Sequence, residues 1–220
     1  QNRGHNILLK INQHNIDELS IENLKKADVV IDFSTPESAK TNIILSIDAK
    51  KPIISGTTGW LDDYKEVKDY CFKNDGAFLY ASNFSLGVNL FFELNKNLAK
   101  LMKKHQQYQI NLTEIHHSEK LDAPSGTAIS LAEQIISESN IKNKWTLNSE
   151  NSDEELKIDV QRKENITGTH SVNYRSETDS ISIKHEAHSR NGFALGAIIA
   201  AEWMINKKGV FSIHDVLSSS

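Results

Sequence analysis

The segment Glu114–Ala128 concentrates the side chains of this chain that are best suited to chemistry. It reads Glu-Ile-His-His-Ser-Glu-Lys-Leu-Asp-Ala-Pro-Ser-Gly-Thr-Ala. His116 can act as a general acid or base near neutral pH, and Lys120 can donate a proton or stabilise negative charge. Ser125–Thr127 stand where a helix begins, so their backbone N–H groups lack helical partners and favour a carboxylate. These parts predict a site for an anionic substrate with an acid nearby.

Each part of this segment also has an ordinary structural explanation. Histidine pairs occur in many loops, and Pro-Ser-Gly-Thr is a common helix start. A metal site would need a third ligand at suitable spacing; His185 and His188 are available, but no spacing requires them, and we predict no metal. Ser125 is not part of a Gly-x-Ser-x-Gly turn, so a serine hydrolase is poorly supported.

The first third of the chain alternates short apolar runs with helical patterns, which predicts a parallel α/β sheet. Thr35 and Pro36 form a good helix start. The predicted strands are Asn6–Ile11, Ala27–Phe33, Lys51–Ser55 and Ala77–Ala81, and the predicted helices are Pro36–Lys50 and Leu61–Asn74.

The pattern changes after Phe84, where an α+β domain with one open sheet face is predicted. Residues 140–155 are polar and loop-like. The apolar helix Phe193–Ile205 is hydrophobic nearly all round and is expected to be buried. An open sheet favours self-association. The predicted helices are Val88–Lys104 and Ala128–Ser139; a strand is predicted at Tyr108–Ile115, and neighbouring antiparallel strands at Leu156–Lys163, Thr169–Arg175 and Ser180–Ala187.

Composition places the chain among soluble globular proteins. The 220 residues are 38% hydrophobic and 25% charged, with a net charge of -4, which gives no basic face for nucleic acid. No apolar stretch is long enough to span a bilayer, and no secretory signal is visible. Cys71 is the single cysteine, which suits a reducing compartment, so we expect a cytoplasmic protein.

The order Glu-x-His-x-x-x-Lys-x-Asp-x-Pro-Ser-Gly-Thr-Ala, matched without a gap over Glu114–Ala128, resembles the signature of dihydrodipicolinate reductases, also called 4-hydroxy-tetrahydrodipicolinate reductases. The preceding Asn111-Leu112 is a minor departure from the Glu-Ile or Glu-Val usual in that family. Further stretches agree in the same order along essentially the whole chain: Val30–Pro36, Gly56–Gly59, Ala81–Asn89, His188–Arg190 and Phe193-Ala.

The resemblance implies a two-domain enzyme that reduces 4-hydroxy-tetrahydrodipicolinate to tetrahydrodipicolinate in lysine (diaminopimelate) biosynthesis with NADH or NADPH. Residues 1–84 and 191–220 would form a Rossmann-like nucleotide-binding domain. Residues 85–190 would form an α+β substrate and tetramerisation domain with an open mixed sheet. The substrate is a small dicarboxylate, and the family implies a homotetramer with no nucleic-acid or membrane partner.

The resemblance also implies site residues. His116 is the acid/base residue and Lys120 the proton donor, and Arg190 would help to close the site. Binding of substrate is implied for His117, Gly126 and Thr127. Contact with the cofactor is implied for Gly56, Thr57, Thr58, Ala81, Ser82, Asn83 and Phe84. Loops that follow strands of an open α/β sheet are the usual ligand positions, although Gly56 and Gly59 could be turn glycines and Phe84 a core residue.

The chain has no Gly-x-Gly-x-x-Gly, the turn that usually cradles a pyrophosphate after the first strand. We expect the first strand, glycine loop and most of the first helix of the fold to be missing from this sequence, and cofactor binding by these residues alone to be weak. Asn6–Ile11 would correspond to the second strand of the complete fold, and Lys10, Asn12 and Gln13 at its end leave the choice between NADH and NADPH open. Two alternatives stay open as well: a binding or regulatory protein without catalysis, and a metal-dependent hydrolase using His116, His117 and a distant histidine.

Overall fold

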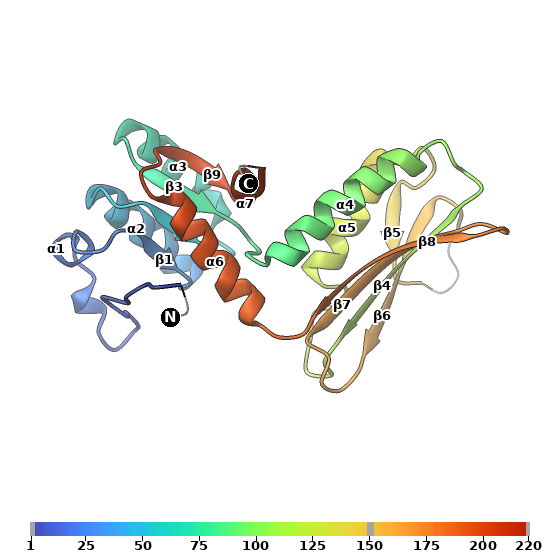
Figure 1. Cartoon of the computed structure of the whole chain (residues 1–220), viewed down its shortest axis with the longest axis horizontal. Coiled ribbons are helices and arrows are strands. Elements are labelled where there is room, and N and C mark those ends of the chain that lie inside the picture. Colours follow the sequence, from blue (N-terminus) through green and yellow to red (C-terminus); the bar gives the residue numbers. More distant parts are fainter. Residues whose placement is uncertain (1–2, 149–151, 219–220) are drawn as a thin grey trace. The chain divides into compact units, whose positions relative to one another are not determined.

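The computed structural model describes residues 3–148 and 152–218. The chain divides into two compact units (Figure 1). Unit 1 combines Gln1–Phe84 with Phe193–Ser220, and unit 2 is Ser85–Gly192. The change of pattern after Phe84 is therefore also a structural boundary.

Unit 1 is built on a four-stranded sheet in which every strand is parallel to its neighbours. Ile53 lies beside Phe78 and Ile54 beside Leu79 in the register, so alternate residues supply the two faces of the sheet. All four of these side chains are fully buried, because helices cover both faces. The strands stand in the order β1 (Val30–Asp32), β2 (Ile53–Ser55), β3 (Ala77–Tyr80) and β9 (Gly209–Ser212).

Helices α2 (Pro36–Asp48) and α3 (Tyr64–Lys73) pack on one face with Ile53 and Phe78. Helix α6 (Asn191–Met204) packs on the other face with Ile54 and Leu79. The predicted parallel α/β sheet is thus confirmed, and its strands are shorter than predicted. The remaining elements of unit 1 are η1 (Ile16–Glu18), α1 (Ile21–Leu24), η2 (Leu61–Asp63) and α7 (Ile213–Ser218).

Two predictions for unit 1 are wrong. Asn6–Ile11 is not a strand, because it joins no ladder, and Ile7 is 79% exposed; apolar β-type residues form a strand only where a partner supplies hydrogen bonds. Helix α6 is not buried all round, since Leu195 is exposed while the opposite face, rich in alanine, meets the sheet.

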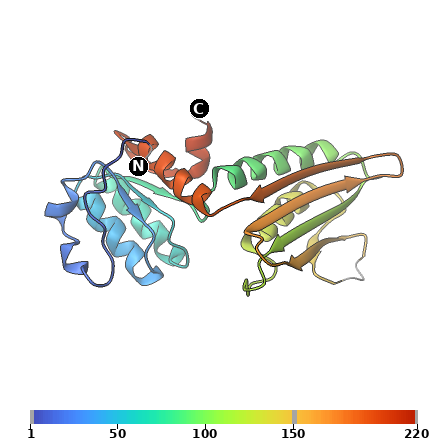
Figure 2. The ribbon, with the colours of Figure 1, turned by 60° about the horizontal axis from the view of Figure 1, so that its bottom comes forward.

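Unit 2 is a five-stranded mixed sheet with two helices on one face (Figures 1 and 2). Helices α4 (Leu86–Met102) and α5 (Gly126–Glu138) cover that face and contact each other. In the described residues no helix covers the other face. The strands stand in the order β5 (Lys144–Thr146), β6 (Glu155–Arg162), β4 (Gln109–His116), β7 (Gly168–Arg175) and β8 (Ser180–Ala187).

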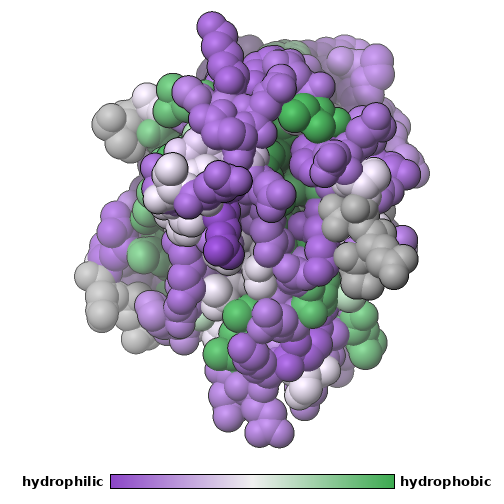
Figure 3. All heavy atoms as spheres, turned by 90° about the vertical axis from the view of Figure 1, so that its right-hand side faces the viewer, coloured by the Kyte–Doolittle hydropathy of each residue, from purple (hydrophilic) through white to green (hydrophobic). Residues whose placement is uncertain are grey.

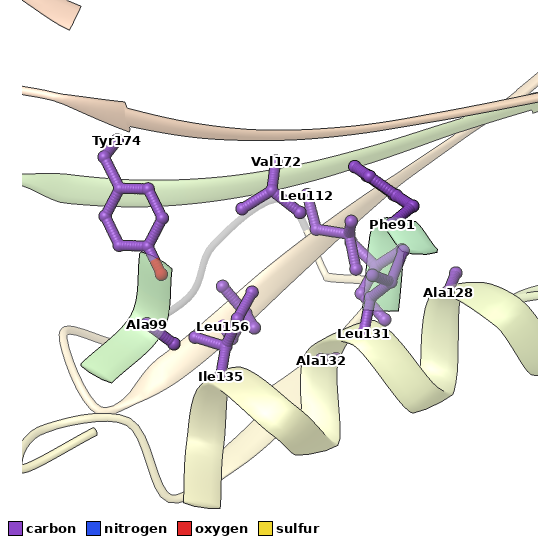
Figure 4. Packing of buried hydrophobic residues seen from close by; sticks show 11 residues of the cluster. Phe91, Ala99, Leu112, Ala128, Leu131, Ala132, Ile135, Leu156, Val172 and Tyr174 are labelled. Atoms are coloured by element: carbon purple, nitrogen blue, oxygen red, sulfur yellow. The ribbon is translucent and has the colours of Figure 1, made fainter. Parts of the chain in front are cut away.

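The core of unit 2 lies between this sheet and α5 (Figure 4). Leu112 and Val172 point from the sheet toward Leu131 and Ile135 of α5, and all four are buried. Each such side chain stabilises the fold by roughly 1.5–3 kcal/mol relative to exposure. This packing fixes the height of α5 above β4, the strand that carries His116.

Two predictions for unit 2 need correction. β6 and β7 are not neighbours, because β4 stands between them and pairs parallel to β6 and antiparallel to β7. Pairing of β7 with β8 is antiparallel as predicted. The predicted loop 140–155, of which residues 149–151 lie outside the described residues, contains β5, which forms an edge strand on β6.

The surface of the described residues is mainly hydrophilic in the view of Figure 3, with scattered apolar side chains. Among these residues, no helix is both long enough and apolar enough to cross a bilayer.

Candidate active site

Strand β4 delivers the central histidine of the site. Leu112, Glu114 and His116 alternate along it and are all buried, so they share the face that α4 and α5 cover. The strand ends at His116, and the loop that follows leads to α5. Burying the polar side chains of Glu114 and His116 costs free energy unless they have hydrogen-bond partners.

The start of α5 supplies a capped helix N-terminus. Ser125 is the N-cap, and its Oγ accepts from the N–H of Ala128 at 3.2 Å. The backbone N–H of Ser125 donates to Glu114 Oε2 at 3.0 Å. A Cβ at Gly126 would meet no atom within 4 Å, so the space above the first turn is open. Free N–H groups next to open space suit an anionic ligand.

Lys120 lies in the loop between β4 and α5. Its Nζ donates to Asp122 Oδ1 at 2.6 Å and Oδ2 at 2.8 Å, and this hydrogen bond is the main cause that lowers the pKa of Asp122. The Lys120 side chain is partly buried, whereas that of Asp122 is largely exposed. Asp122 therefore binds the ammonium group of Lys120, and a ligand carboxylate would have to compete with it for this group.

Glu114 lies at the centre of a buried polar cluster that the sequence did not predict. Its side chain is fully buried, and it lies 3.7 Å from His170 Nε2 and 3.3 Å from Arg162 Nη1. Burial alone would raise the pKa of Glu114, but the contacts with His170 and with the side chain and N–H of Ser125 outweigh it and lower the pKa to about 2. The carboxylate is therefore ionised at neutral pH.

Burial has the larger effect at His116, and this side chain is neutral at neutral pH. Burial lowers its pKa to about 4, although the Glu114 carboxylate nearby acts in the opposite direction. Electrostatic interactions with His170, Lys120 and Arg162 add to the lowering. A neutral imidazole accepts a proton or a hydrogen bond; it does not supply a proton. Of the two predicted catalytic residues, His116 is thus suited to accept a proton at neutral pH.

Glu114, His116 and His170 offer ligand atoms within 4.8 Å of one another, a grouping that could hold a metal ion. The metal-site alternative used His116, His117 and a distant histidine; the structure groups His116 with the distant His170 and with Glu114, but not with His117. Arg162 and the Ser125 N–H already occupy the Glu114 oxygens. A guanidinium 3.3 Å from the carboxylate opposes a second cation, so the arrangement is that of a hydrogen-bonded cluster.

All the residues predicted to act on substrate fall on one continuous segment of unit 2. The N–H of Lys120 donates to the carbonyl of His117 at 3.2 Å, which makes a turn of the loop. Thr127 lies in the first turn of α5 beside Gly126. Arg190 is exposed in the segment between β8 and α6.

The sequence analysis missed His170 and Arg162. Each lies at a core-facing position of a strand with alternating burial, and this alternation is the signal that could have found them.

The residues predicted to contact a cofactor follow the carboxyl ends of β2 and β3 in unit 1. Asp32 organises this edge, because it accepts from the hydroxyls of Ser55 at 2.9 Å and Thr57 at 2.8 Å. Thr57 Oγ1 in turn accepts from the N–H of Ser34 at 2.8 Å. The Thr57 side chain therefore faces inward, and only its backbone is available to a ligand.

The two predicted loops differ in what they expose. Thr58 and Ser82 are exposed. Phe84 is buried in the core of unit 1, which agrees with the alternative interpretation of Phe84 as a core residue. The ring of Phe33 lies 5.6 Å from that of Phe84, and a Cβ at Gly56 would collide with it. A glycine at this position thus allows an aromatic ring against the loop.

Doubly wound parallel sheets with loops at these positions bind nucleotides at the carboxyl ends of the strands. Unit 2 adds a helix N-terminus beside open space, with Lys120 in the loop that precedes it. The chain therefore has the architecture of a nucleotide-dependent enzyme with a separate substrate unit.

Comparison with known proteins identifies the family. Residues 2–84 match the family model "Dihydrodipicolinate reductase, N-terminus", and residues 87–217 match "Dihydrodipicolinate reductase, C-terminus". The chain belongs to the dihydrodipicolinate reductase family.

Relatives with the name 4-hydroxy-tetrahydrodipicolinate reductase agree with this assignment. The protein of Christiangramia forsetii is 48% identical over 99% of this chain and 90% of its own length. That of Methanococcoides burtonii is 37% identical over 88% of this chain and 74% of its own length. The fold matches the dipicolinate-bound dihydrodipicolinate reductase from Paenisporosarcina sp. TG-14 with a TM-score of 0.72, at 21% identity, covering 94% of this chain and 81% of that one.

Proposed function

We propose that this chain reduces 4-hydroxy-tetrahydrodipicolinate to tetrahydrodipicolinate in lysine (diaminopimelate) biosynthesis, with NADH or NADPH as reductant. The observation that carries the proposal is the intact substrate segment, in which Lys120, His116 and the open N-terminus of α5 follow one another. Its 48% identical relative has the same reductase name.

The names of substrate and product define the balance of the reaction. The product lacks the 4-hydroxyl, so water leaves, and one hydride and one proton are added. A bound NADH or NADPH supplies the hydride. The residues of this chain bind the dicarboxylate, hold it in place and supply the proton.

One carboxylate of the substrate binds at the start of α5. The N–H groups of Gly126 and Thr127 are in the first turn, and the helix dipole favours negative charge there. His117 is half-buried beside the loop and contributes a further polar contact. The structure of a relative described as dipicolinate-bound supports a dicarboxylate ligand for this fold.

Lys120 donates the proton, and His116 accepts a hydrogen bond from substrate or takes up a proton. Their different protonation follows from burial, which keeps His116 neutral at neutral pH. Asp122 holds Lys120 until the substrate carboxylate replaces it. The His116→Gln and Lys120→Ala variants test these roles: nucleotide oxidation with 4-hydroxy-tetrahydrodipicolinate falls strongly in both, and normal turnover in both would refute the assignment.

The cofactor residues fit the nicotinamide end of a dinucleotide. Backbone groups of Gly56 and Ala81 lie at the ends of adjacent strands, and Thr58 and Ser82 expose hydroxyls beside them. Phe33 is 57% exposed and offers a flat apolar face. Parallel titrations of fluorescence with NADH and NADPH determine the preference. Binding of dipicolinate without any nucleotide oxidation would instead indicate a binding protein.

We also propose a cytoplasmic homotetramer that assembles through the uncovered face of the sheet of unit 2. This face is polar: Asn111 pairs across strands with Asn173 and donates to Asp159 at 2.9 Å. The Asn111 Oδ1 is buried yet lacks a hydrogen-bond partner. A second copy could satisfy it. Light scattering on the eluted protein measures the mass, and a monomer at micromolar concentration would refute the assembly.

A further inference from the structure

Glu114 is a buried charge that the reaction itself does not use. It is fully buried, and the register pairs it with His170 on β7. Cross-strand partners share a face, so His170 points to the same side of the sheet and is itself 4% exposed. A carboxylate without solvent is costly unless hydrogen-bonded donors surround it. Its donors therefore show what it holds in place.

Two donors of Glu114 hold the loop between β4 and α5 at separate points. At the end of the loop, the N–H of Ser125 donates to Oε2 at 3.0 Å. In the middle of the loop, Arg162 donates to the carbonyls of Lys120 at 3.2 Å and Asp122 at 2.7 Å, and it also donates to Oε1 of Glu114 at 3.3 Å. The backbone of Lys120 is thus fixed to β6 by a guanidinium that Glu114 itself orients.

His116 is a further neighbour of Glu114. Its Nδ1 lies 3.7 Å from Oε2 and is buried without any hydrogen-bond partner. Its Nε2 is directed toward Gly168, where a Cβ would lie at 3.1 Å. An unpaired buried nitrogen is unfavourable. A shift of about 1 Å would bring Nδ1 to a charge-assisted hydrogen bond of about 2.8 Å with the carboxylate.

We propose that Glu114 is the positioning residue of this site: it holds His116 with its proton on Nδ1, which leaves Nε2 as the acceptor, and it fixes the Lys120 loop through Arg162. This inference rests on the proposed function for its kinetic consequence. Its structural content, the tautomer of His116, stands on the geometry of the cluster alone. The two are therefore tested by different readouts.

The Glu114→Gln variant separates charge from shape. Glutamine keeps the volume, and its oxygen can accept from Arg162 at the Oε1 position. Its NH2 group then takes the Oε2 position, where it loses the Ser125 hydrogen bond but can donate to Nδ1 and so favour the other tautomer of His116. General acid–base catalysis contributes about 10²–10⁴-fold, so we expect kcat to fall about 100-fold. KM for the substrate and affinity for dipicolinate change little, because the N-terminus of α5 stays in place.

The imidazole ¹⁵N shifts of His116 report the tautomer without any turnover. The wild-type protein shows the proton on Nδ1 at neutral pH, and Glu114→Gln loses this state. Glu114→Asp keeps the negative charge and is expected to retain the proton on Nδ1 of His116. Asp159→Asn is the matched control: this partly buried carboxylate on β6 bonds to Asn111 and Lys157, away from the cluster, and its removal leaves tautomer and kcat unchanged.

A wild-type His116 with its proton on Nε2 overturns the proposal, and this measurement needs no variant to fold. The same holds if Glu114→Gln keeps both the wild-type tautomer and the wild-type kcat. If the wild-type protein shows the Nδ1 proton but does not oxidise nucleotide, the proposed function fails while the positioning role of Glu114 is supported.

Discussion

Acidification is expected to destabilise unit 2 in two separate pH ranges. The pKa of His116 is lowered from 6.5 to about 4 by burial. A group with a depressed pKa binds fewer protons in the folded state, so its contribution to stability is complete above pH 6.5 and is lost as the pH falls from about 6.5 to about 4. The pKa of Glu114 is lowered from 4.5 to about 2, so its contribution is lost below about 4.5.

The size of each contribution follows from the change in pKa. A fall of about 2.5 in the pKa, at about 1.4 kcal/mol per pKa unit, gives about 3.5 kcal/mol for His116, which is almost fully buried. Glu114 gives a similar figure, but the two groups face each other, so their sum is not additive. Burial also lowers the pKa of His185, which lies on β8 beyond β7, so its protonation adds to the loss of stability on acidification.

Fluorine-labelled tryptophan reports the two units separately in one urea titration. Trp145 lies in β5 of unit 2, whereas Trp60 and Trp203 lie in unit 1. The urea midpoint at Trp145 is expected to fall between about pH 7 and pH 4.5, with a much smaller change at the other two. His116→Gln should weaken this dependence. A wild-type midpoint at Trp145 that is constant over this range would refute the reasoning.

Three further outcomes follow from single contacts. Gly168→Ala places a Cβ 3.1 Å from His116 Nε2, so steady-state kinetics should show kcat/KM reduced by up to about 100-fold with an unchanged melting temperature; unchanged kinetics would mean that the ring is free to move. Leu131→Ala removes a fully buried side chain from the core of unit 2 and should cost about 2–5 kcal/mol, seen as a lower urea midpoint at Trp145. Asp32→Asn removes the carboxylate that accepts from two hydroxyls beside the cofactor loop, so NADH affinity should fall about tenfold while dipicolinate affinity holds; equal loss of both affinities would contradict a local role.

Local signals were sufficient for several of the helices and strands. The Thr35-Pro36 start of α2 and the periodic apolar residues of that helix are properties of a few neighbouring residues, and the helix forms where they predict it. The alternation of β8 likewise gave its bounds, Ser180–Ala187. Asn6–Ile11 shows the limit of this reasoning: its apolar residues suit a strand, but no partner strand of the described residues pairs with it.

The sequence by itself determined the family and the segment Glu114–Ala128, because the spacing of histidine, lysine and the Ser-Gly-Thr turn is a property of contiguous residues. Only the tertiary structure decided what surrounds that segment. β4 is inserted between β6 and β7, and this order brings Arg162 from one side and His170 from the other against Glu114. Strand order depends on long-range pairing and on the packing of α4 and α5, and no local pattern encodes it. The buried cluster that sets the protonation of His116 is therefore a product of the fold.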